Sequence, residues 1–192
     1  MVEIRIHGRG GQGVVTAADL VAMAAFKEGH HAQAFPSFGS ERTGAPVVSY
    51  CRVEDHEIRS REPVLEPDII IVQDPTLLPV MDVFAGLKPG GYVIINSTKP
   101  FAELELEGVV AKAGEDRVAT VPATEIAREH LGRPLPNAAL LGAMAALTGL
   151  VDITSVEEAI KTRFYGRVGE SNAVAARAAY DFVKESADAE AD

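Results

Sequence analysis

The feature of this sequence that most constrains its fold is a glycine-rich loop between a strand-like and a helix-like stretch. The loop reads "HGRGGQGVV" over residues 7–15, and its G-x-G-x-x-G spacing is formed by Gly8, Gly10 and Gly13. The preceding "VEIRIHG" alternates apolar and polar residues, which predicts a strand. Residues 12–28 are apolar over most of a helical circumference and end at Gly29, which predicts a helix. A strand, a glycine turn and a helix in this order predict an α/β domain whose helix N-terminus can attract an anion.

Further strand-like segments predict the rest of the sheet. The runs "DIIIVQD" and "GGYVIIN" are continuously apolar, as is typical of parallel strands buried on both faces. The segments "HHAQAFPSF" and "PVVSYCRV" predict strands separated by the loop "GSERTGA", "EIRS" predicts a short hairpin partner, and "RVATVPA" predicts the last strand. We therefore expect one Rossmann-like layered α/β domain with a mostly parallel sheet and a short β-hairpin.

The remaining segments predict helices and a helical C-terminal region. Those with helical character are residues 75–85, 123–131, 137–147 and 171–184. Thr154 and Glu157 have the spacing of a capping box, which predicts a further helix that begins there. The pattern predicts a single domain over residues 1–184 and an acidic disordered tail over residues 185–192.

Composition narrows the class of protein. A formal net charge of −10 over 192 residues disfavours a nucleic-acid partner, because nucleic-acid phosphates are bound by clustered Lys and Arg. No apolar stretch reaches the roughly 18 residues that span a membrane, and Glu3 and Arg5 interrupt the place of a secretory leader. With Cys51 as the single cysteine, this chain alone can build neither an internal disulfide nor a cysteine cage for zinc or an iron–sulfur cluster. We expect a cytoplasmic protein with no membrane partner and no metal site of its own.

The glycine loop admits three interpretations: it binds the pyrophosphate of NAD, it binds the phosphates of another nucleotide, or it serves only close helix–strand packing. NAD binding usually needs an Asp or Glu about 20 residues further on, at the end of the second strand. The strand "HHAQAFPSF" ends without an acid, and the nearest ones are Glu28 before it and Glu41 after it. Arg9 suits an exposed phosphate better than a tight dinucleotide turn. NAD binding is therefore the less favoured interpretation.

Two blocks taken together, "GRGGQGVVTAADLVAMAA" and "SFGSERTGAPVVSYCRV", resemble a known family. It is the gamma subunit, equivalent to the third domain of the fused enzyme, of pyruvate:ferredoxin and related 2-oxoacid:ferredoxin oxidoreductases. The segments "PDIIIVQDPTLL", "GGYVIINS", "PNAALLGAMAALTGLV" and "ESNAVAARAAYDFV" are similar to later parts of that subunit, in the same order. The resemblance covers nearly the whole chain up to the acidic tail.

The resemblance implies a specific chemistry. The assembled enzyme decarboxylates a 2-oxoacid on thiamine diphosphate, passes electrons through 4Fe–4S clusters to ferredoxin, and transfers the acyl group to coenzyme A. Thiamine diphosphate, Mg and the clusters are implied on partner subunits of the alpha, beta and delta types. The gamma subunit is implied to contribute to assembly and to the coenzyme A side of the active centre, without a catalytic residue of its own. The stretch Thr43-Gly44-Ala45 suggests the pyruvate-like branch, with pyruvate as the default substrate.

The resemblance also assigns candidate cofactor-binding residues. They are Gly8, Arg9, Gly10, Gly11, Gln12, Gly13, Glu41, Arg42, Thr43 and Gly44. Arg9 is open to two roles, a phosphate contact or a surface salt bridge. Arg42 is open to binding coenzyme A phosphates or a substrate carboxylate bidentately, or to pairing with Glu41 at a subunit contact. Asp74, after a buried strand, either contacts a ligand or caps the next helix.

Other residues of chemical interest have plainer interpretations. Cys51 lies mid-strand and is interpreted as buried filler rather than as a nucleophile. His30 and His31 are adjacent, so on a strand they point to opposite faces and cannot share a metal. A set of small residues is interpreted as a close-packing surface, within this chain or against another: Gly142, Ala143, Ala146 and Gly149.

Three functions follow from these observations. The favoured one is a gamma subunit that is inactive alone and works with thiamine- and cluster-binding partners. The second is a stand-alone NAD(P)-dependent dehydrogenase with a Rossmann domain. The third is a purely structural bridging subunit whose glycine loop meets no ligand.

Overall fold

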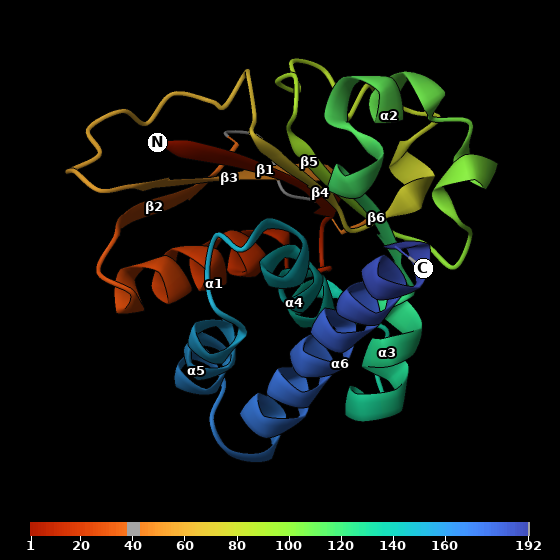
Figure 1. Cartoon of the computed structure of the whole chain (residues 1–192). Coiled ribbons are helices and arrows are strands. Elements are labelled where there is room, and N and C mark those ends of the chain that lie inside the picture. The colour runs from red at the N-terminus through yellow and green to blue at the C-terminus, as the bar shows by residue number, and fades with distance from the viewer. Residues whose placement is uncertain (38–42, 192) are drawn as a thin grey trace.

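The fold is built on a six-stranded sheet in the order β2-β3-β1-β4-β5-β6 (Figure 1). The computed structural model describes residues 1–37 and 43–191. The strands are β1 (Val2–Arg9), β2 (His31–Pro36), β3 (Pro46–Glu54), β4 (Ile69–Val72), β5 (Tyr92–Asn96) and β6 (Val118–Val121). Neighbours from β1 through β4 and β5 to β6 are parallel, whereas β3 runs antiparallel to both β1 and β2. The predicted α/β class with a mostly parallel sheet is confirmed, and the β2–β3 pair is its hairpin.

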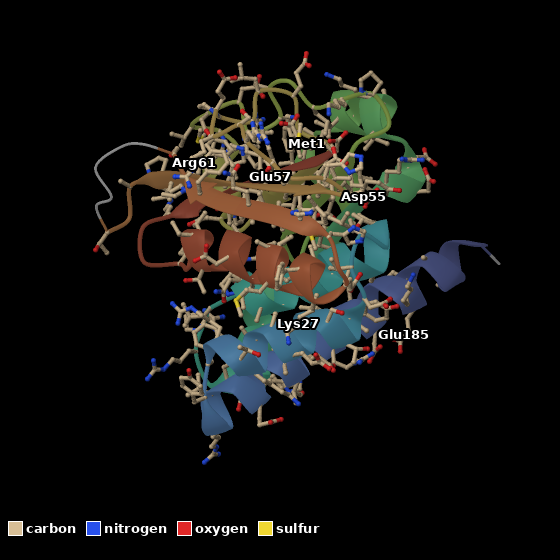
Figure 2. The ribbon with its side chains drawn as sticks, turned by 90° about the vertical axis from the view of Figure 1, so that its left-hand side faces the viewer. Met1, Lys27, Asp55, Glu57, Arg61 and Glu185 are labelled. Atoms are coloured by element: carbon tan, nitrogen blue, oxygen red, sulfur yellow. The ribbon has the colours of Figure 1, made fainter. Side chains whose placement is uncertain are left out.

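The helices lie mainly on one side of this sheet. The bounds are α1 (Val14–Lys27), α2 (Glu107–Ala113), α3 (Ala123–Leu131), α4 (Asn137–Thr148), α5 (Ile153–Arg163) and α6 (Gly166–Ala191), with short 3₁₀ turns η1 (Pro75–Leu77), η2 (Phe101–Leu104) and η3 (Glu115–Arg117). Helix α2 lies on the other side of the sheet (Figure 1). Figure 2 shows the two layers from the side, with Lys27 and Glu185 in the helical layer and Asp55, Glu57 and Arg61 on the loop side. The predicted helical C-terminal region is confirmed.

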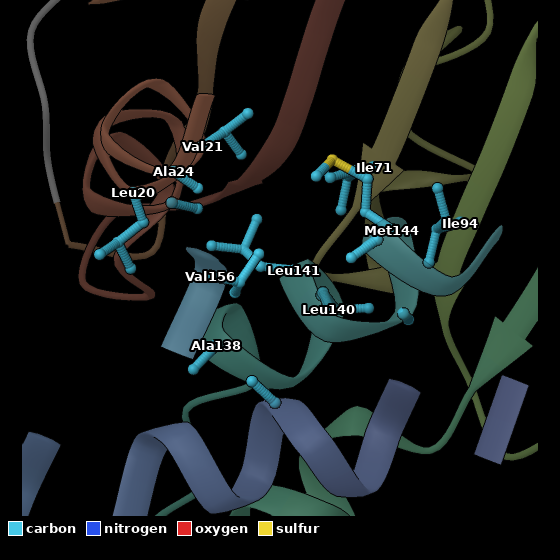
Figure 3. Packing of buried hydrophobic residues seen from close by; sticks show 14 of the residues in the cluster. Leu20, Val21, Ala24, Ile71, Ile94, Ala138, Leu140, Leu141, Met144 and Val156 are labelled. Atoms are coloured by element: carbon cyan, nitrogen blue, oxygen red, sulfur yellow. The ribbon is translucent and has the colours of Figure 1, made fainter. Parts of the chain in front are cut away.

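Both faces of the sheet are covered by apolar packing. Along β4, Ile69 and Ile71 join the cluster on the helical side, and Ile70 and Val72 join the cluster on the loop side. This double burial is why the β4 segment is continuously apolar. Figure 3 shows the helical side, where residues of three helices and two strands belong to one cluster: Leu20, Val21 and Ala24 of α1, Leu140, Leu141 and Met144 of α4, Val156 of α5, with Ile71 and Ile94.

On the loop side, two polar residues of β1 are buried. Arg5 is 7% exposed and His7 is 3% exposed. The Arg5 Nε donates to His7 Nε2 at 3.0 Å, and its Nη atoms donate to the carbonyl oxygens of Val64, Val83 and Ala85. The alternation of β1 therefore separates two buried faces, one apolar and one polar. The guanidinium ties two irregular segments to the sheet.

These side-chain contacts explain why two predicted elements are wrong. Residues 75–85 were expected to form a helix, but only η1 is helical, and the carbonyls near the end of the segment accept from Arg5. The segment "EIRS" was expected to be a hairpin strand, but it forms none. Instead, Arg52 donates to the carbonyl oxygens of Ser60 and Glu62. In both segments an arginine of the sheet satisfies carbonyls that a helix or strand would have used.

The C-terminal helices also differ from their predicted ends. Helix α5 begins at Ile153, so Thr154 lies inside it and forms no capping box, while Glu157 accepts from Arg177 Nε at 2.7 Å. Helix α6 runs from Gly166 to Ala191, beyond the expected range of 171–184 at both ends and into the segment assigned to a tail. Acidic alanine-rich sequence is compatible with a helix because alanine and glutamate have high helix propensity.

The burial of His7 makes stability depend on pH. Burial first, and then the adjacent Arg5, lower the pKa of His7 from 6.5 to about 3 against an opposing contribution from the Val83 carbonyl. The unfolded chain takes up this proton near pH 6.5 and the folded chain does not, so stability is full above that pH and is lost as pH falls toward 3. We expect His7 alone to lower the free energy of unfolding by about 2 kcal/mol between pH 7 and pH 5.

The measurement is urea denaturation of the wild type and His7→Gln at these two pH values. Glutamine offers an acceptor to Arg5 but does not titrate, so the variant should lose less stability than the wild type on acidification. The other histidines contribute equally to both proteins and cancel in the difference. An equal loss in both proteins would show that His7 is not held neutral.

Candidate functional site

The glycine loop leaves the carboxyl end of β1 and enters α1 through a left-handed turn. Gly13 is the N-cap of α1 with φ 72°, a conformation that favours glycine. A Cβ added there would lie 2.7 Å from Asn137 Nδ2, so α4 begins directly beside the loop. A Cβ at Gly8 would lie 2.5 Å from Val14 Cγ2. The glycines are therefore needed for both backbone conformation and close packing.

The N-terminus of α1 faces a cavity of about 550 Å³. No side chain caps the helix, and the first backbone bond runs from Ala17 N to Gly13 O at 2.9 Å. The N–H groups of Val14, Val15 and Thr16 precede that bond and have no partner within the helix. The cavity is lined by the loop, by the first turn of α1 and by the ends of β2 and β3: Arg9, Gly10, Gly11, Gly13, Val14, Val15, Thr16, Pro36, Ser37 and Val47. Such an end attracts anions.

The fold brings the second predicted block against the first. Gly10 and Thr43 form a parallel bridge, Gly10 N donates to Ala45 O at 2.9 Å, and Gly44 N donates to Gly10 O at 3.1 Å. Thr43 and Gly44 therefore lie beside the glycine loop, as a shared site requires. Glu41 and Arg42 lie outside the described residues, and their roles stay predictions.

The side chain of Arg9 is hydrogen-bonded to two neighbouring loops. Its Nη1 donates to Gly44 O at 3.0 Å, and its Nε and Nη2 donate to Thr76 Oγ1 at 3.0 and 2.9 Å. Its Nε lies 3.3 Å from Asp74 Oδ2, and 26% of the side chain is exposed. Of its two predicted roles, the salt bridge is present, and it links three segments of the site.

Asp74 caps η1, one of the two roles predicted for it. Its Oδ1 accepts from Thr76 N at 2.9 Å and Thr76 Oγ1 at 2.6 Å, and its Oδ2 accepts from Gln12 Nε2 at 2.7 Å. Burial alone would raise the pKa of this carboxyl group, but the hydrogen bonds from Thr76 and Gln12, together with Arg9, outweigh it and lower the pKa. The carboxylate is therefore ionised at neutral pH.

Two residues that sequence reasoning missed extend this network. Gln73 Nε2 donates to Gln12 O at 3.1 Å, and Asn96 Nδ2 donates to Gln73 O at 2.9 Å. Thr124 N donates to Asn96 Oδ1 at 3.2 Å, which connects the network to α3. Gln73 directly follows β4, and Asn96 is the last residue of β5. The sequence indicates such residues by their position, because each is a polar residue at the end of a buried parallel strand, where α/β folds place their ligand sites.

Cys51 and Gly142 both lie in packed parts of the chain. Cys51 is buried, and burial first, followed by the charge of Asp19, raises the pKa of its thiol to about 12. It is therefore a thiol at neutral pH, as its interpretation as filler requires. Gly142 packs against α6 of the same chain, because a Cβ there would lie 1.8 Å from Ala176 O.

Neither a metal cluster nor a membrane segment is found in the residues that the structure describes. No group of three or more His, Cys, Asp and Glu side chains in residues 1–37 and 43–191 is placed to hold a metal ion. Within the same ranges, no helix combines the length and the apolar character that crossing a bilayer requires.

Curated relatives match nearly the whole chain. The family model described as "Pyruvate ferredoxin/flavodoxin oxidoreductase" matches residues 3–182. The pyruvate/ketoisovalerate oxidoreductases common subunit gamma of Thermococcus kodakarensis is 54% identical over 181 residues, which cover 94% of this chain and 96% of the relative. The pyruvate synthase subunit PorC of Methanothermobacter thermautotrophicus is 48% identical over 184 residues, which cover 96% and 97% of the two chains.

Solved structures agree with this assignment. Pyruvate oxidoreductase subunit PORC of Thermotoga maritima matches with a TM-score of 0.77 and 37% identity, covering 94% of this chain and 95% of that one. The 2-oxoglutarate:ferredoxin oxidoreductase of Magnetococcus marinus, with 2-oxoglutarate, coenzyme A and succinyl-CoA bound, shares the fold at a TM-score of 0.68 and 20% identity, over 98% of this chain and 31% of that one. The chain therefore belongs to the pyruvate ferredoxin/flavodoxin oxidoreductase family and corresponds to its gamma subunit.

Proposed function

We propose that this gamma subunit supplies the coenzyme A side of a 2-oxoacid:ferredoxin oxidoreductase, with pyruvate as the default 2-oxoacid. The observation that carries the proposal is the uncapped N-terminus of α1, which faces a cavity of about 550 Å³ beside the joined glycine and Thr43-Gly44 segments. Coenzyme A carries phosphates that such N–H groups attract. Pyruvate appears in the names of both relatives cited above, and ketoisovalerate appears in one of them. These names support pyruvate as the default 2-oxoacid.

In this proposal the chain binds and orients a substrate, and the redox chemistry takes place on its partners. The complete reaction converts a 2-oxoacid, coenzyme A and oxidised ferredoxin into acyl-CoA, CO₂ and reduced ferredoxin. The residues of this chain do not fit an iron–sulfur cluster, because its one cysteine is buried and its thiolate is disfavoured. We assign thiamine diphosphate, Mg and the 4Fe–4S clusters to subunits of the alpha, beta and delta types, in a complex that works in the cytoplasm with ferredoxin.

The sheet order argues against the alternative of a stand-alone NAD(P)-dependent dehydrogenase. In the usual dinucleotide fold the second strand lies beside the first and presents an acid at the same edge of the sheet. Here β3 separates β2 from β1 and runs in the opposite direction. The edge near the glycine loop therefore holds the start of β3 at Pro46, and the strand next to β1 on that side is antiparallel.

A substitution in the first turn of α1 tests whether the cavity binds coenzyme A. Thr16→Glu places a carboxylate among the N–H groups, where it complements the helix dipole and repels a phosphate. In the assembled complex we expect the KM for coenzyme A to rise about tenfold, which corresponds to about 1.4 kcal/mol of lost binding. The subunit itself should be no less stable, because an acidic residue in the first turn stabilises a helix.

The matched control is Thr16→Gln, which has the same size without the charge, and its KM for coenzyme A should stay within about twofold of the wild type. Equal KM values for both variants and the wild type would favour the third function, a structural bridge whose loop meets no ligand. Arg42→Ala, measured in the same assay, tests the predicted role of the residue outside the described ranges.

A further inference from the structure

We propose, on the basis of the proposed function, that Gln12 and Asp74 are positioning residues that hold the glycine loop in its ligand-binding conformation, with Arg9 as their partner rather than as a direct counterion of the ligand. The family resemblance implies a place for Gln12 and Arg9 on the ligand side of the loop. The proposal instead assigns the binding of the anion to backbone N–H groups and the shape of the loop to three side chains.

The contacts of Arg9 support a structural role for its side chain. All three guanidinium nitrogens have acceptors: Nη1 bonds to Gly44 O, and both Nε and Nη2 bond to Thr76 Oγ1. Asp74 Oδ2 lies 3.3 Å from Nε and balances the charge. These bonds use at least three of the five guanidinium N–H groups and hold the side chain to two other segments of the site, while Arg9 also belongs to the cavity lining.

Gln12 connects the loop to Asp74 with a fixed polarity. Its Oε1 accepts from the backbone N of Arg9 at 2.7 Å, and its Nε2 donates to Asp74 Oδ2 at 2.7 Å. The amide cannot be flipped, because its NH₂ group would then face the Arg9 N–H and its oxygen would face a carboxylate. Each end of the side chain thus requires the partner it has.

The position of this bridge explains how it acts on the cavity. The side chain of Gln12 points to Asp74, and Gln12 is absent from the residues that line the cavity, whereas Gly11 and Gly13 on either side line it. Gln12 N also donates to Arg9 O at 3.1 Å, which closes the turn. Fixing residue 12 therefore fixes the direction of the N–H groups that follow, and small misplacements of such groups weaken binding strongly.

Two substitutions and their combination test the polarity of the bridge. Asp74→Asn keeps an oxygen for Thr76 but turns an NH₂ group against the donors of Gln12 and Arg9, and Gln12→Glu sets two carboxylates against each other. In the assembled complex we expect each to raise the KM for coenzyme A about tenfold, with a smaller change in kcat. The double variant Gln12→Glu/Asp74→Asn exchanges donor and acceptor between residues 12 and 74 at the same total charge, while an amide still faces Arg9 Nε, so we expect its KM to fall below that of either single variant without full recovery.

The opposite result identifies a ligand role for Arg9. If Arg9 bound the phosphate and Asp74 only restrained it, Asp74→Asn would release the guanidinium and lower KM or leave it unchanged, which would overturn the proposal. A KM of the double variant no lower than that of the single variants would overturn it as well. Asp82→Asn is the matched control, because Asp82 Oδ1 also caps a turn, accepting from Phe84 N at 3.1 Å, on a segment outside the cavity lining.

Thr16→Glu, measured in the same series, separates this inference from the proposed function. A raised KM in Thr16→Glu together with wild-type KM values in Gln12→Glu and Asp74→Asn would refute the positioning role and leave the coenzyme A site intact. Wild-type KM in Thr16→Glu would refute the coenzyme A site, and the positioning role with it. Melting temperatures of all variants show whether a KM change accompanies loss of the fold.

Discussion

Replacing Arg5 by methionine, which matches only the aliphatic stem of the arginine, is expected to lower the free energy of unfolding by about 3 to 5 kcal/mol. Methionine would leave the carbonyl oxygens of Val64, Val83 and Ala85, and also His7 Nε2, without the donor that now binds them. A buried acceptor that loses its partner costs about 1 to 3 kcal/mol, and part of this cost is relieved when segments move toward water. Chemical denaturation of the purified chain measures the change.

Two further variants separate the effect of geometry from that of charge. Arg5→Lys keeps the positive charge but lacks the planar fork that reaches several acceptors at once, so we expect a partial loss of stability. Arg59→Met removes an exposed arginine whose partner is Glu57, and its effect should stay within about 0.5 kcal/mol. If Arg5→Met lowered the free energy of unfolding no more than Arg59→Met does, Arg5 would not be what holds the two irregular segments on the sheet.

Introducing valine at Gly142 is expected to cost at least about 3 kcal/mol, because it forces α4 away from α6. An added Cβ at this position would lie 1.8 Å from the carbonyl oxygen and 2.6 Å from the carbonyl carbon of Ala176. Both atoms belong to the backbone of α6, so no side-chain rotation relieves the overlap. Helices α4 and α6 both contribute to the core cluster on the helical side, so their separation would open that core. The midpoint of urea denaturation measures the effect.

Gly108 is the matched control for Gly142, because we expect an added side chain there to raise the stability of the chain. Gly108 lies in α2, and apart from the adjacent residues and the backbone of its own helix no atom lies within 4 Å of a Cβ added there. Gly108→Ala should therefore stabilise the chain by up to about 1 kcal/mol through helix propensity and the reduced freedom of the unfolded state. Gly142→Ala should destabilise despite the same gain in propensity, and equal signs for the two alanine variants would disprove the close approach of α4 to α6.

The functional site was predicted in part. The glycine loop was readable because its glycines set the local backbone and stand between a strand and a helix, and the structure places Thr43 and Gly44 beside it. The partners of the loop were not readable. Arg9 and Thr76 are 67 positions apart, and Gln12 and Asp74 are 62 apart. Only the parallel pairing of β1 and β4 brings these residues together.

By itself the sequence determined the strands and helices whose patterns are local: the alternation in β1, the apolar runs of β4 and β5, and the glycines at the ends of α1 and α3. These patterns report backbone conformation and burial within a few residues, which is why they were readable. Tertiary structure alone decided that residues 78–85 and 57–60 stay irregular and that the polar side of β1 is buried. The reason is that Arg5 binds carbonyls 78 and 80 positions away and Arg52 binds carbonyls 8 and 10 positions away, and both guanidinium groups are placed by the sheet.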